Sequence, residues 1–219
     1  RKYFREQLKI AEARSNRTKN SMAIYVIDLN DFKGINDSFG HSGGDKLLVE
    51  VSQRLLNCVG PLDTIARLGG DEFAVIQQGI KDLDSSAQLV RRLCEQIVAP
   101  ILLNHTEVRP SASIGVSLYP DDGKNAEAVL INADIAMYLA KKDNGVSYRF
   151  FEPEMNASIV RRKRLADDLK VAIQESQLAL FYQPIVNLDT GLIESTEALL
   201  RWHHESYGYV SPLEVVSVA

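Results

Sequence analysis

The chain has 219 residues, of which 45% are hydrophobic and 25% charged, the composition of an ordinary globular protein and not of a disordered or fibrous one. Its formal net charge of −4 gives no reason to expect nucleic acid as a partner. It contains no run of about 18 apolar residues, so we predict no membrane-spanning segment and no contact of this stretch with a membrane.

The two cysteines and the start of the chain bear on its compartment. Cys58 and Cys94 lie within apolar helical patterns, so we predict free thiols in a reducing compartment and neither a disulfide nor a metal site. Arg1-Lys2-Tyr3 opens in the middle of a pattern without a signal peptide, as a fragment would. We therefore expect a cytoplasmic segment, and a membrane anchor or sensor upstream of Arg1 stays open.

The beginning of the chain predicts a helix, a buried strand and a second helix. Residues 1 to about 20 are charged and carry apolar residues at helical spacing. Residues 22–27 form a continuous apolar run, typical of a central strand covered on both faces, and polar residues collect where it ends. The glycine-rich residues 40–44 are predicted to turn into a helix at about Asp45 and to offer free backbone N–H groups to an anion.

A β-hairpin is predicted next, around the glycine pair at residues 69–70. Short apolar runs flank the pair, and paired glycines accept the positive φ values that tight turns demand. The turn places Asp71 and Glu72 side by side at its tip, and two fixed carboxylates suit a divalent cation such as Mg²⁺. A solvated acidic turn is the alternative for this motif taken alone.

The remaining pattern completes one layered domain. It predicts a helix over residues 83–98, a half-buried strand over 108–118, a turn at 120–123, a helix over 129–142 and a last strand over 148–151. The order of strand, helix, hairpin, helix, strand, helix and strand is that of an α/β domain of roughly 150 residues.

From Pro153 onward the pattern changes. A helix with apolar residues at helical spacing is predicted up to about residue 177, and its basic cluster Arg161–Arg164 is interpreted as a solvated face. Strands near residues 178–182 and 192–193 then predict the start of a second domain. The sequence stops at Ala219, before we expect that domain to complete a core.

Three carboxylates of the first domain invite a chemical interpretation. Asp28 ends the buried strand, whereas Asp71 and Glu72 occupy the hairpin tip. If the two elements are neighbours in one sheet, these carboxylates can hold one or two Mg²⁺ ions, which implies phosphoryl or nucleotidyl chemistry.

Four further polar residues fit a nucleotide substrate. Lys33 and Lys141 are candidates for positive charge beside phosphates. Asn36 and Asp45 are candidates for reading a base edge, because a carboxylate can accept paired hydrogen bonds from the amino and imino groups of guanine.

Several motifs, in this order, resemble the GGDEF family, the diguanylate cyclases. They are residues 28–37 (DLNDFKGIND), 40–45 (GHSGGD) and 67–73 (RLGGDEF), extended by matches at 112–115, 133–134 and 138–141. The resemblance covers about residues 1–151. It implies an α/β (α+β) fold like that of nucleotidyl cyclases and polymerase palm domains, with a central, mostly antiparallel sheet flanked by helices. It also implies the conversion of two GTP into cyclic di-GMP and two pyrophosphates with Mg²⁺ or Mn²⁺.

The resemblance also implies roles by position. Each subunit would hold one GTP and the 3′-oxygen of one would attack the α-phosphorus of the other, so a homodimer is required for turnover. In the family pattern the metal ligands are Asp28, the Leu29 carbonyl and Asp71, and Glu72 is a further ligand or the base for the 3′-hydroxyl group. Guanine is held by Asn36 and Asp45. The phosphates are lined by Phe32, Lys33 and Lys141.

This chain departs from the family pattern in three places. The inhibitory product site of the family has an Arg-x-x-Asp before the hairpin, but residues 60–63 read Gly-Pro-Leu-Asp, so we predict no tight product inhibition there. Gly145 stands where the family has an arginine on phosphate, and losing such a contact costs roughly 1.5–3 kcal/mol. A Leu-Thr-Gly-Leu-type turn would lie just before Arg1.

The tail carries a second resemblance. Residues 181–186 and 197–202 look like the opening of an EAL domain, the cyclic di-GMP phosphodiesterase family with a TIM-like barrel. That resemblance implies Glu197 as a metal ligand and Gln183 and Arg201 as substrate contacts. Because the other ligands would lie beyond Ala219, we expect no hydrolysis by this piece.

The predicted domains are a GGDEF domain (1–152), a linking helix (153–177) and the start of an EAL domain (178–219). Our leading hypothesis is a cyclase domain from a bacterial GGDEF–EAL second-messenger protein. The alternative is a catalytically weak or inactive GTP-binding module that regulates an adjoining phosphodiesterase. A pure scaffold would leave the carboxylates unexplained.

Overall fold

A computed structural model describes residues 2–80, 82–143 and 147–218, which form two compact units, Arg1–Asn156 and Ala157–Ala219. We call them the first and the second unit. Within the described residues, no helix combines the length and the apolar character needed to cross a bilayer.

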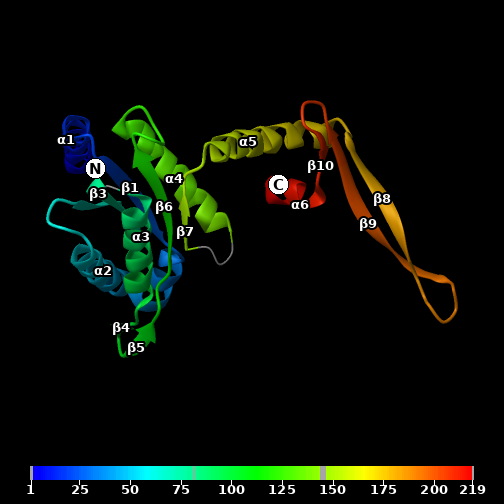
Figure 1. Ribbon diagram of the computed structural model, residues 1–219. Helices are drawn as coiled ribbons and strands as arrows, with labels where there is room; N and C mark the ends of the chain where they lie inside the picture. Colours follow the sequence, from blue (N-terminus) through cyan, green and yellow to red (C-terminus); the bar gives the residue numbers. More distant parts are fainter. Residues whose placement is uncertain (1, 81, 144–146, 219) are drawn as a thin grey trace. The chain divides into compact units, whose positions relative to one another are not determined.

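The first unit is built on a five-stranded sheet with the order β2-β3-β1-β6-β7, antiparallel except for the β6–β7 pair (Figure 1). This is the mixed α/β architecture with a mostly antiparallel central sheet that the resemblance implied. Its elements are α1 (Lys2–Thr18), β1 (Ser21–Leu29), α2 (Phe32–Cys58), β2 (Thr64–Gly69), β3 (Glu72–Ile80), α3 (Leu83–Val98), β4 (Ile101–Leu103), β5 (Thr106–Val108), β6 (Ala112–Tyr119), α4 (Ala126–Lys142) and β7 (Tyr148–Phe150).

Strand β1 shows why helices cover both faces of this sheet. Successive side chains of a strand point to opposite faces. Tyr25 and Ile27 pack into the core formed with α2 and α3, whereas Ile24 and Val26 pack into the core formed with α1 and α4. A continuous apolar run is therefore the sequence that a central strand between two helical layers requires.

Helix α2 corrects the predicted turn at residues 40–44. The helix already begins at Phe32, after Asp31 accepts a 3.3 Å hydrogen bond from the Gly34 N–H, and only Gly40, with φ 72°, interrupts it. A Cβ on Gly44 would overlap the side-chain oxygen of Asn36. This glycine serves close packing inside the helix, so the N–H groups expected to be free near it belong to helical residues.

The strand predicted over residues 108–118 also differs from the structure. Strand β6 begins at Ala112 and is buried throughout, because it lies between β1 and β7 with helices on both faces. The residues before it form the short β4–β5 hairpin, whose three-residue strands are too brief to show a period.

The second unit contains most of helix α5 (Pro153–Gln174), strands β8 (Leu178–Val186), β9 (Ile193–His204) and β10 (Gly208–Val210), and helix α6 (Pro212–Val218). Its antiparallel sheet has the order β10-β9-β8. The core contains Leu165 and Leu169 of α5, Trp202 of β9 and Val215 of α6. His204 is buried beside Asp168 and His203 is exposed, so these neighbours on β9 point to opposite sides of the sheet.

The basic cluster on α5 is not simply a solvated face, contrary to its interpretation from the sequence. The Nε and Nη2 atoms of Arg161 donate to the two carboxylate oxygens of Glu214, at 2.8 and 3.1 Å. The Cζ atom of Arg161 lies 4.6 Å from the Tyr207 ring centre. Arg162 donates to the backbone carbonyl of Ser217. The cluster therefore joins α6 and the β9–β10 turn to α5.

Candidate active site

The first pair of candidate residues is fixed by strand register. Asp28 lies directly opposite Glu72 in the antiparallel β1–β3 pair. Directly opposed residues share one face of a sheet, and Val26 and Ala74, two residues away on each strand, face α1 and α4. Asp28 and Glu72 are therefore on the α1–α4 side at the end of the sheet, and Asp28 is only 8% exposed.

The hairpin that carries Asp71 is braced from two sides. Gly69 and Gly70 have φ values of 149° and 55°, which confirms the predicted role of the glycine pair. The Leu29 N–H donates to the Asp71 carbonyl at 3.3 Å, and the Arg67 Nε donates to the Gly70 carbonyl at 2.8 Å. The first bond holds the turn against the end of β1, and the second closes the hairpin itself, a role of Arg67 that the sequence did not reveal.

Lys141 reaches the same place from helix α4. Its Nζ lies 2.5 Å from Oδ1 of Asp28, and its side chain remains 45% exposed. Gly115 explains the close approach of α4 to the sheet, because a Cβ there would overlap the carbonyl oxygen of Ala133 and the amide nitrogen of Met137. The structure thus brings Asp28, Glu72 and Lys141 together.

Asp134 is a site residue that sequence reasoning missed. It lies two turns before Lys141 on the same side of α4, and burial together with the charge of Asp28 raises the pKa of its carboxyl group. The spacing of seven residues was the available signal, but it gains meaning only once α4 lies on β1.

The carboxylates at the end of the sheet have the chemistry that a divalent cation requires. Among the described residues, no three His, Cys, Asp or Glu side chains converge at metal-ligand geometry. Mg²⁺ usually needs only one or two carboxylates, together with waters and substrate phosphates. Asp28, Asp71 and Glu72 offer hard oxygen donors on two bonded segments, and Asp28 already faces a cation, the Lys141 ammonium. These residues therefore fit such an ion.

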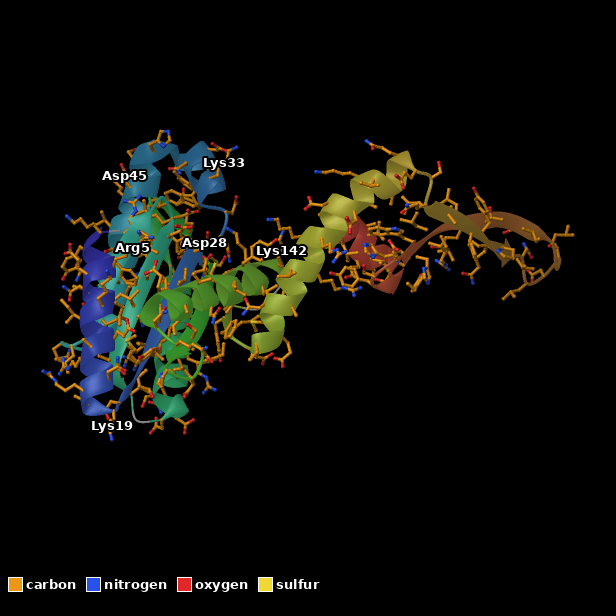
Figure 2. The ribbon with its side chains drawn as sticks, turned by 90° about the horizontal axis from the view of Figure 1, so that it is seen from above. Arg5, Lys19, Asp28, Lys33, Asp45 and Lys142 are labelled. Atoms are coloured by element: carbon orange, nitrogen blue, oxygen red, sulfur yellow. The ribbon has the colours of Figure 1, made fainter. Side chains whose placement is uncertain are left out.

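The start of α2 lies directly after β1 and carries two predicted phosphate contacts. Asp31 adopts the left-handed conformation, with φ 52°, and turns the chain into the helix. Phe32 is half-buried against the core, whereas Lys33 is exposed (Figure 2). A helix N-terminus presents N–H groups and positive dipole to an anion. The start of α2 therefore has the geometry that was expected of the glycine-rich residues 40–44, which lie within the helix.

The predicted guanine contacts Asn36 and Asp45 are drawn together across the break at Gly40. The Asn36 amide packs against Gly44, the neighbour of Asp45, and Asp45 itself is exposed. Figure 2 shows Lys33 and Asp45 near one end of the first unit and Lys19 at the other.

Two further positions of the family pattern are those where this chain departs from it. In the 60–63 loop, Asp63 accepts hydrogen bonds from the N–H groups of Gly60 and Gln78, at 2.7 and 2.9 Å, so its carboxylate is engaged in closing the loop. Gly145, which replaces the family arginine, lies outside the described residues.

In the second unit, the predicted EAL residues share one ribbon. Gln183 and Glu197 lie directly opposite each other on β8 and β9 and are exposed. The Arg201 guanidinium lies 5.5 Å from the Phe181 ring centre. The register alone brings Gln183 and Glu197 together.

Comparisons with known proteins also divide the chain into two parts. Residues 1–146 match the family described as diguanylate cyclase, GGDEF domain, and residues 166–219 match the EAL domain. The chain is similar to a solved structure of the GGDEF domain of YfiN (TpbB) from Pseudomonas aeruginosa. The TM-score is 0.70 at 34% identity, over 73% of this chain and 93% of that one.

Two curated relatives from Pseudomonas aeruginosa extend over both parts. The chain is 41% identical over 214 residues, 98% of its length, to the bifunctional diguanylate cyclase/cyclic di-GMP phosphodiesterase MucR, of which it covers 31%. It is 36% identical over 198 residues, 90% of its length, to the cyclic di-GMP phosphodiesterase NbdA, of which it covers 25%. The chain thus spans about a quarter to a third of the length of these relatives.

Proposed function

The chain belongs to the GGDEF (diguanylate cyclase) family and continues into an EAL domain, and on that premise we propose that its first unit condenses two GTP into cyclic di-GMP. The observation that carries this proposal is the meeting of Asp28, Glu72 and Lys141 at the end of the sheet, beside the braced hairpin of Asp71. Neither a solvated turn nor a scaffold requires that meeting.

Asp28, Asp71, Glu72 and the Leu29 carbonyl would hold Mg²⁺ or Mn²⁺. Such an ion, when bound, lowers the pKa of a hydroxyl group and offsets negative charge on a phosphoryl group under attack. A rigid, nearly buried Asp28 suits this role, because its position requires no rearrangement of the strand.

The remaining residues would bind and orient GTP. The first turn of α2, with Phe32 and Lys33, would receive the terminal phosphates, and the exposed Lys141 would contact them from the other side. Asp45 would accept hydrogen bonds from the amino and imino groups of guanine, and the Asn36 amide, which can both donate and accept, would contact the same base.

Glu72 would receive the proton of the 3′-hydroxyl group, or else remain a metal ligand. In either case that hydroxyl must reach the α-phosphorus of a GTP on a second copy of the chain. A homodimer, at least a transient one, is therefore part of the proposal.

A second candidate function is a GTP-binding module that regulates an adjoining cyclic di-GMP phosphodiesterase. The direct run of the chain through α5 into an EAL match favours it, as does similarity to a relative named as a phosphodiesterase. The two candidates share the same nucleotide site and differ in whether GTP is converted.

The test is incubation of concentrated protein with GTP and Mg²⁺, followed by chromatographic separation of the nucleotides, with Asp71→Ala as the inactive control. Cyclic di-GMP from the parent alone supports the cyclase. Intact GTP together with a GTP-dependent rise in melting temperature would favour the regulator, and neither effect would refute both.

A further inference from the structure

Asn30 follows the last residue of β1 and ties the end of that strand to the beginning of β6 with three hydrogen bonds. Its backbone N–H donates to the Ser111 carbonyl at 2.8 Å. Its side-chain Nδ2 donates to the Ser111 hydroxyl at 3.2 Å, and its Oδ1 accepts from the Ser113 hydroxyl at 3.0 Å. An amide side chain can serve two hydroxyl groups in this way because it carries both a donor and an acceptor.

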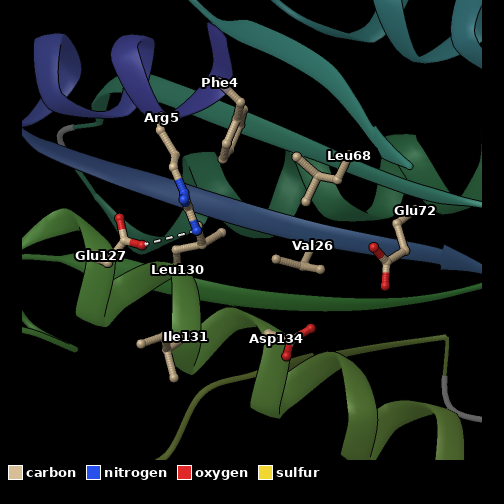
Figure 3. A pocket seen from close by; sticks show the side chains of 9 residues that line it. All are labelled: Phe4, Arg5, Val26, Leu68, Glu72, Glu127, Leu130, Ile131 and Asp134. Carbon is tan, nitrogen blue, oxygen red and sulfur yellow. Dashed lines mark ion pairs between the residues drawn. The ribbon is translucent and has the colours of Figure 1, made fainter. Parts of the chain in front are cut away.

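This contact lies on the face of the sheet that carries the candidate metal ligands. Ser113 is directly opposite Asp28 in the β1–β6 pair, and Asp28 is directly opposite Glu72 in the β1–β3 pair. Directly opposed residues share one face of a sheet. Figure 3 shows Glu72 on this face, which α4 covers with Asp134. The serine that holds Asn30 is therefore a neighbour of the site.

The direction of the Leu29 carbonyl follows from the hydrogen bonds on either side of β1. The Leu29 N–H donates to the Asp71 carbonyl on the hairpin side, whereas the Asn30 N–H donates to Ser111 on the β6 side. In an antiparallel sheet the N–H and C=O groups of one residue point to the same neighbouring strand. The Leu29 carbonyl therefore points toward the hairpin that carries Asp71.

That carbonyl lacks the partner that a regular sheet would give it. A regular antiparallel pair returns a hydrogen bond from the Asp71 N–H to the Leu29 carbonyl. Between these two described residues only the forward bond, from Leu29 to Asp71, is formed. Leu29 is 1% exposed, so bulk water does not freely replace the missing donor. A buried carbonyl oxygen of this kind, close to carboxylates, is a suitable ligand for a hard cation.

We propose that Asn30 is a positioning residue of the candidate metal site. Its two serine contacts fix the peptide bond between Leu29 and Asn30, so that the Leu29 carbonyl faces the divalent cation. The next residue explains why this peptide needs support, because Asp31 takes the left-handed conformation there and turns the chain into α2. The inference rests on the proposed function, since it takes the Leu29 carbonyl to be a metal ligand.

The alternative is that Asn30 only closes the turn between β1 and α2. Loss of its side chain would then lower stability without a specific effect on the metal. Asn30→Leu tests this, because it keeps the approximate size and the backbone N–H but loses both serine contacts. Asn30→Asp is the conservative variant, since both serine hydroxyls can turn to donate to a carboxylate.

The experiment is calorimetric titration of the whole chain with a GTP analogue that has a methylene group between its α- and β-phosphorus atoms and cannot react. For the parent, Mg²⁺ should tighten the Kd at least about tenfold relative to EDTA. Asn30→Leu should lose about tenfold in metal affinity, as expected for a group that orients a ligand, and therefore most of this gain. Its Kd in EDTA should stay within about twofold of the parent value. Asn30→Asp should keep the Mg²⁺ gain.

A matched control lies at the other end of β6. The Tyr119 hydroxyl donates to Oδ1 of Asn16 at 2.8 Å, and Tyr119 pairs with Met22 at the beginning of β1. Asn16→Leu also removes a side-chain contact to β6, but far along the strands from Asp28. It should lower the melting temperature measured in EDTA and leave the Mg²⁺ gain unchanged.

The outcomes separate this inference from the proposed function. Equal Mg²⁺ gains in the parent and Asn30→Leu overturn the positioning role while the metal site stands. Equal weakening of Asn30→Leu in Mg²⁺ and in EDTA also overturns it, because the residue would then be structural alone. No Mg²⁺ gain in the parent contradicts the proposed function and the role of Asn30 together. A gain that Asn30→Leu loses, in a protein that leaves GTP intact, supports the positioning role and the regulator.

Discussion

The two units hold their candidate functional residues in different ways. Asp28 is at the end of a strand buried between two helical layers, and its neighbours are fixed by register on both sides. Gln183 and Glu197 are also paired by register, but on a ribbon where Phe181 and Tyr182 are 60% and 64% exposed. Site geometry in the first unit is therefore imposed by a core, whereas in the second unit it depends on the β8–β9 pairing alone.

The largest effect should come from changing a carboxylate at the end of the first sheet. Asp28→Asn keeps the shape of the side chain but removes the charge opposite Glu72 and beside Lys141. If the first unit is a cyclase, turnover of GTP should fall by about 10³-fold or more. Glu197→Gln in the second unit is the matched control and should leave that rate unchanged. Equal losses in both variants would contradict the assignment of GTP turnover to the first unit.

The next effect concerns the packing that places Lys141. Gly115→Ala adds a methyl group that would overlap the backbone of α4, so the helix must move away from β6. We expect a loss of about 3 kcal/mol in the free energy of unfolding, measured by urea denaturation of the first unit's transition. Gly60→Ala is the control, since its methyl group would meet only the Asp63 carboxylate, at 3.2 Å. Similar stability of the two variants would show that α4 is not held as closely as described.

A smaller effect is expected where α6 joins α5 in the second unit. Arg161→Ala removes a two-point contact with Glu214 and the stacking on Tyr207, but both charged side chains are about a third exposed. The second unit should lose about 1 kcal/mol, seen as a lower melting temperature. Lys163→Ala, on the exposed side of the same helix, should change nothing. A loss well above that of a solvated pair would mean that this contact is a central part of the unit.

The smallest effect is a pH dependence in the first unit. Burial and the charge of Asp28 raise the pKa of Asp134, so the folded protein retains a proton that the unfolded chain has released. Stability must therefore fall as pH rises from the ordinary aspartate value of 3.8 through the raised pKa. Asp134→Asn should remove this fall and be slightly more stable than the parent at pH 7 in metal-free buffer. Parallel stability curves for parent and variant between pH 3.5 and pH 7 would contradict it (roughly the range in which carboxyl groups titrate).

How much the sequence predicted depends on whether the signal was local. The apolar run that becomes β1 and the glycine pair at 69–70 are local signals, and both predictions are confirmed. The sequence placed Gly44 in a turn. In the structure this position needs a glycine because the Asn36 side chain packs against it, and that contact is made only after α2 has formed. The strands of the β4–β5 hairpin have three residues each, too few for the alternation of buried and exposed residues to be recognised in the sequence.

The candidate site shows the same limit. Asp28, Asp71, Glu72 and Lys141 could be named from motifs, and strand register and α4 then explain why Asp28, Glu72 and Lys141 lie close together. Asp134 could not be singled out, because its spacing of seven residues from Lys141 gains meaning only once α4 lies on β1 and brings it to Asp28. The stabilising role of Arg161 likewise depends on Glu214 of α6, which lies 53 residues further along the chain.

The most direct test of the central claim, that the end of the first sheet is a metal-dependent GTP site, is calorimetric titration of the parent and Asp71→Ala with GTP, in Mg²⁺ and in EDTA. Both the cyclase and the regulator require this site, so the measurement does not depend on turnover. We predict that Mg²⁺ tightens the Kd of the parent at least about tenfold and has little effect on the variant. Equal affinity in Mg²⁺ and EDTA, or the same Mg²⁺ dependence in the variant, would contradict the account.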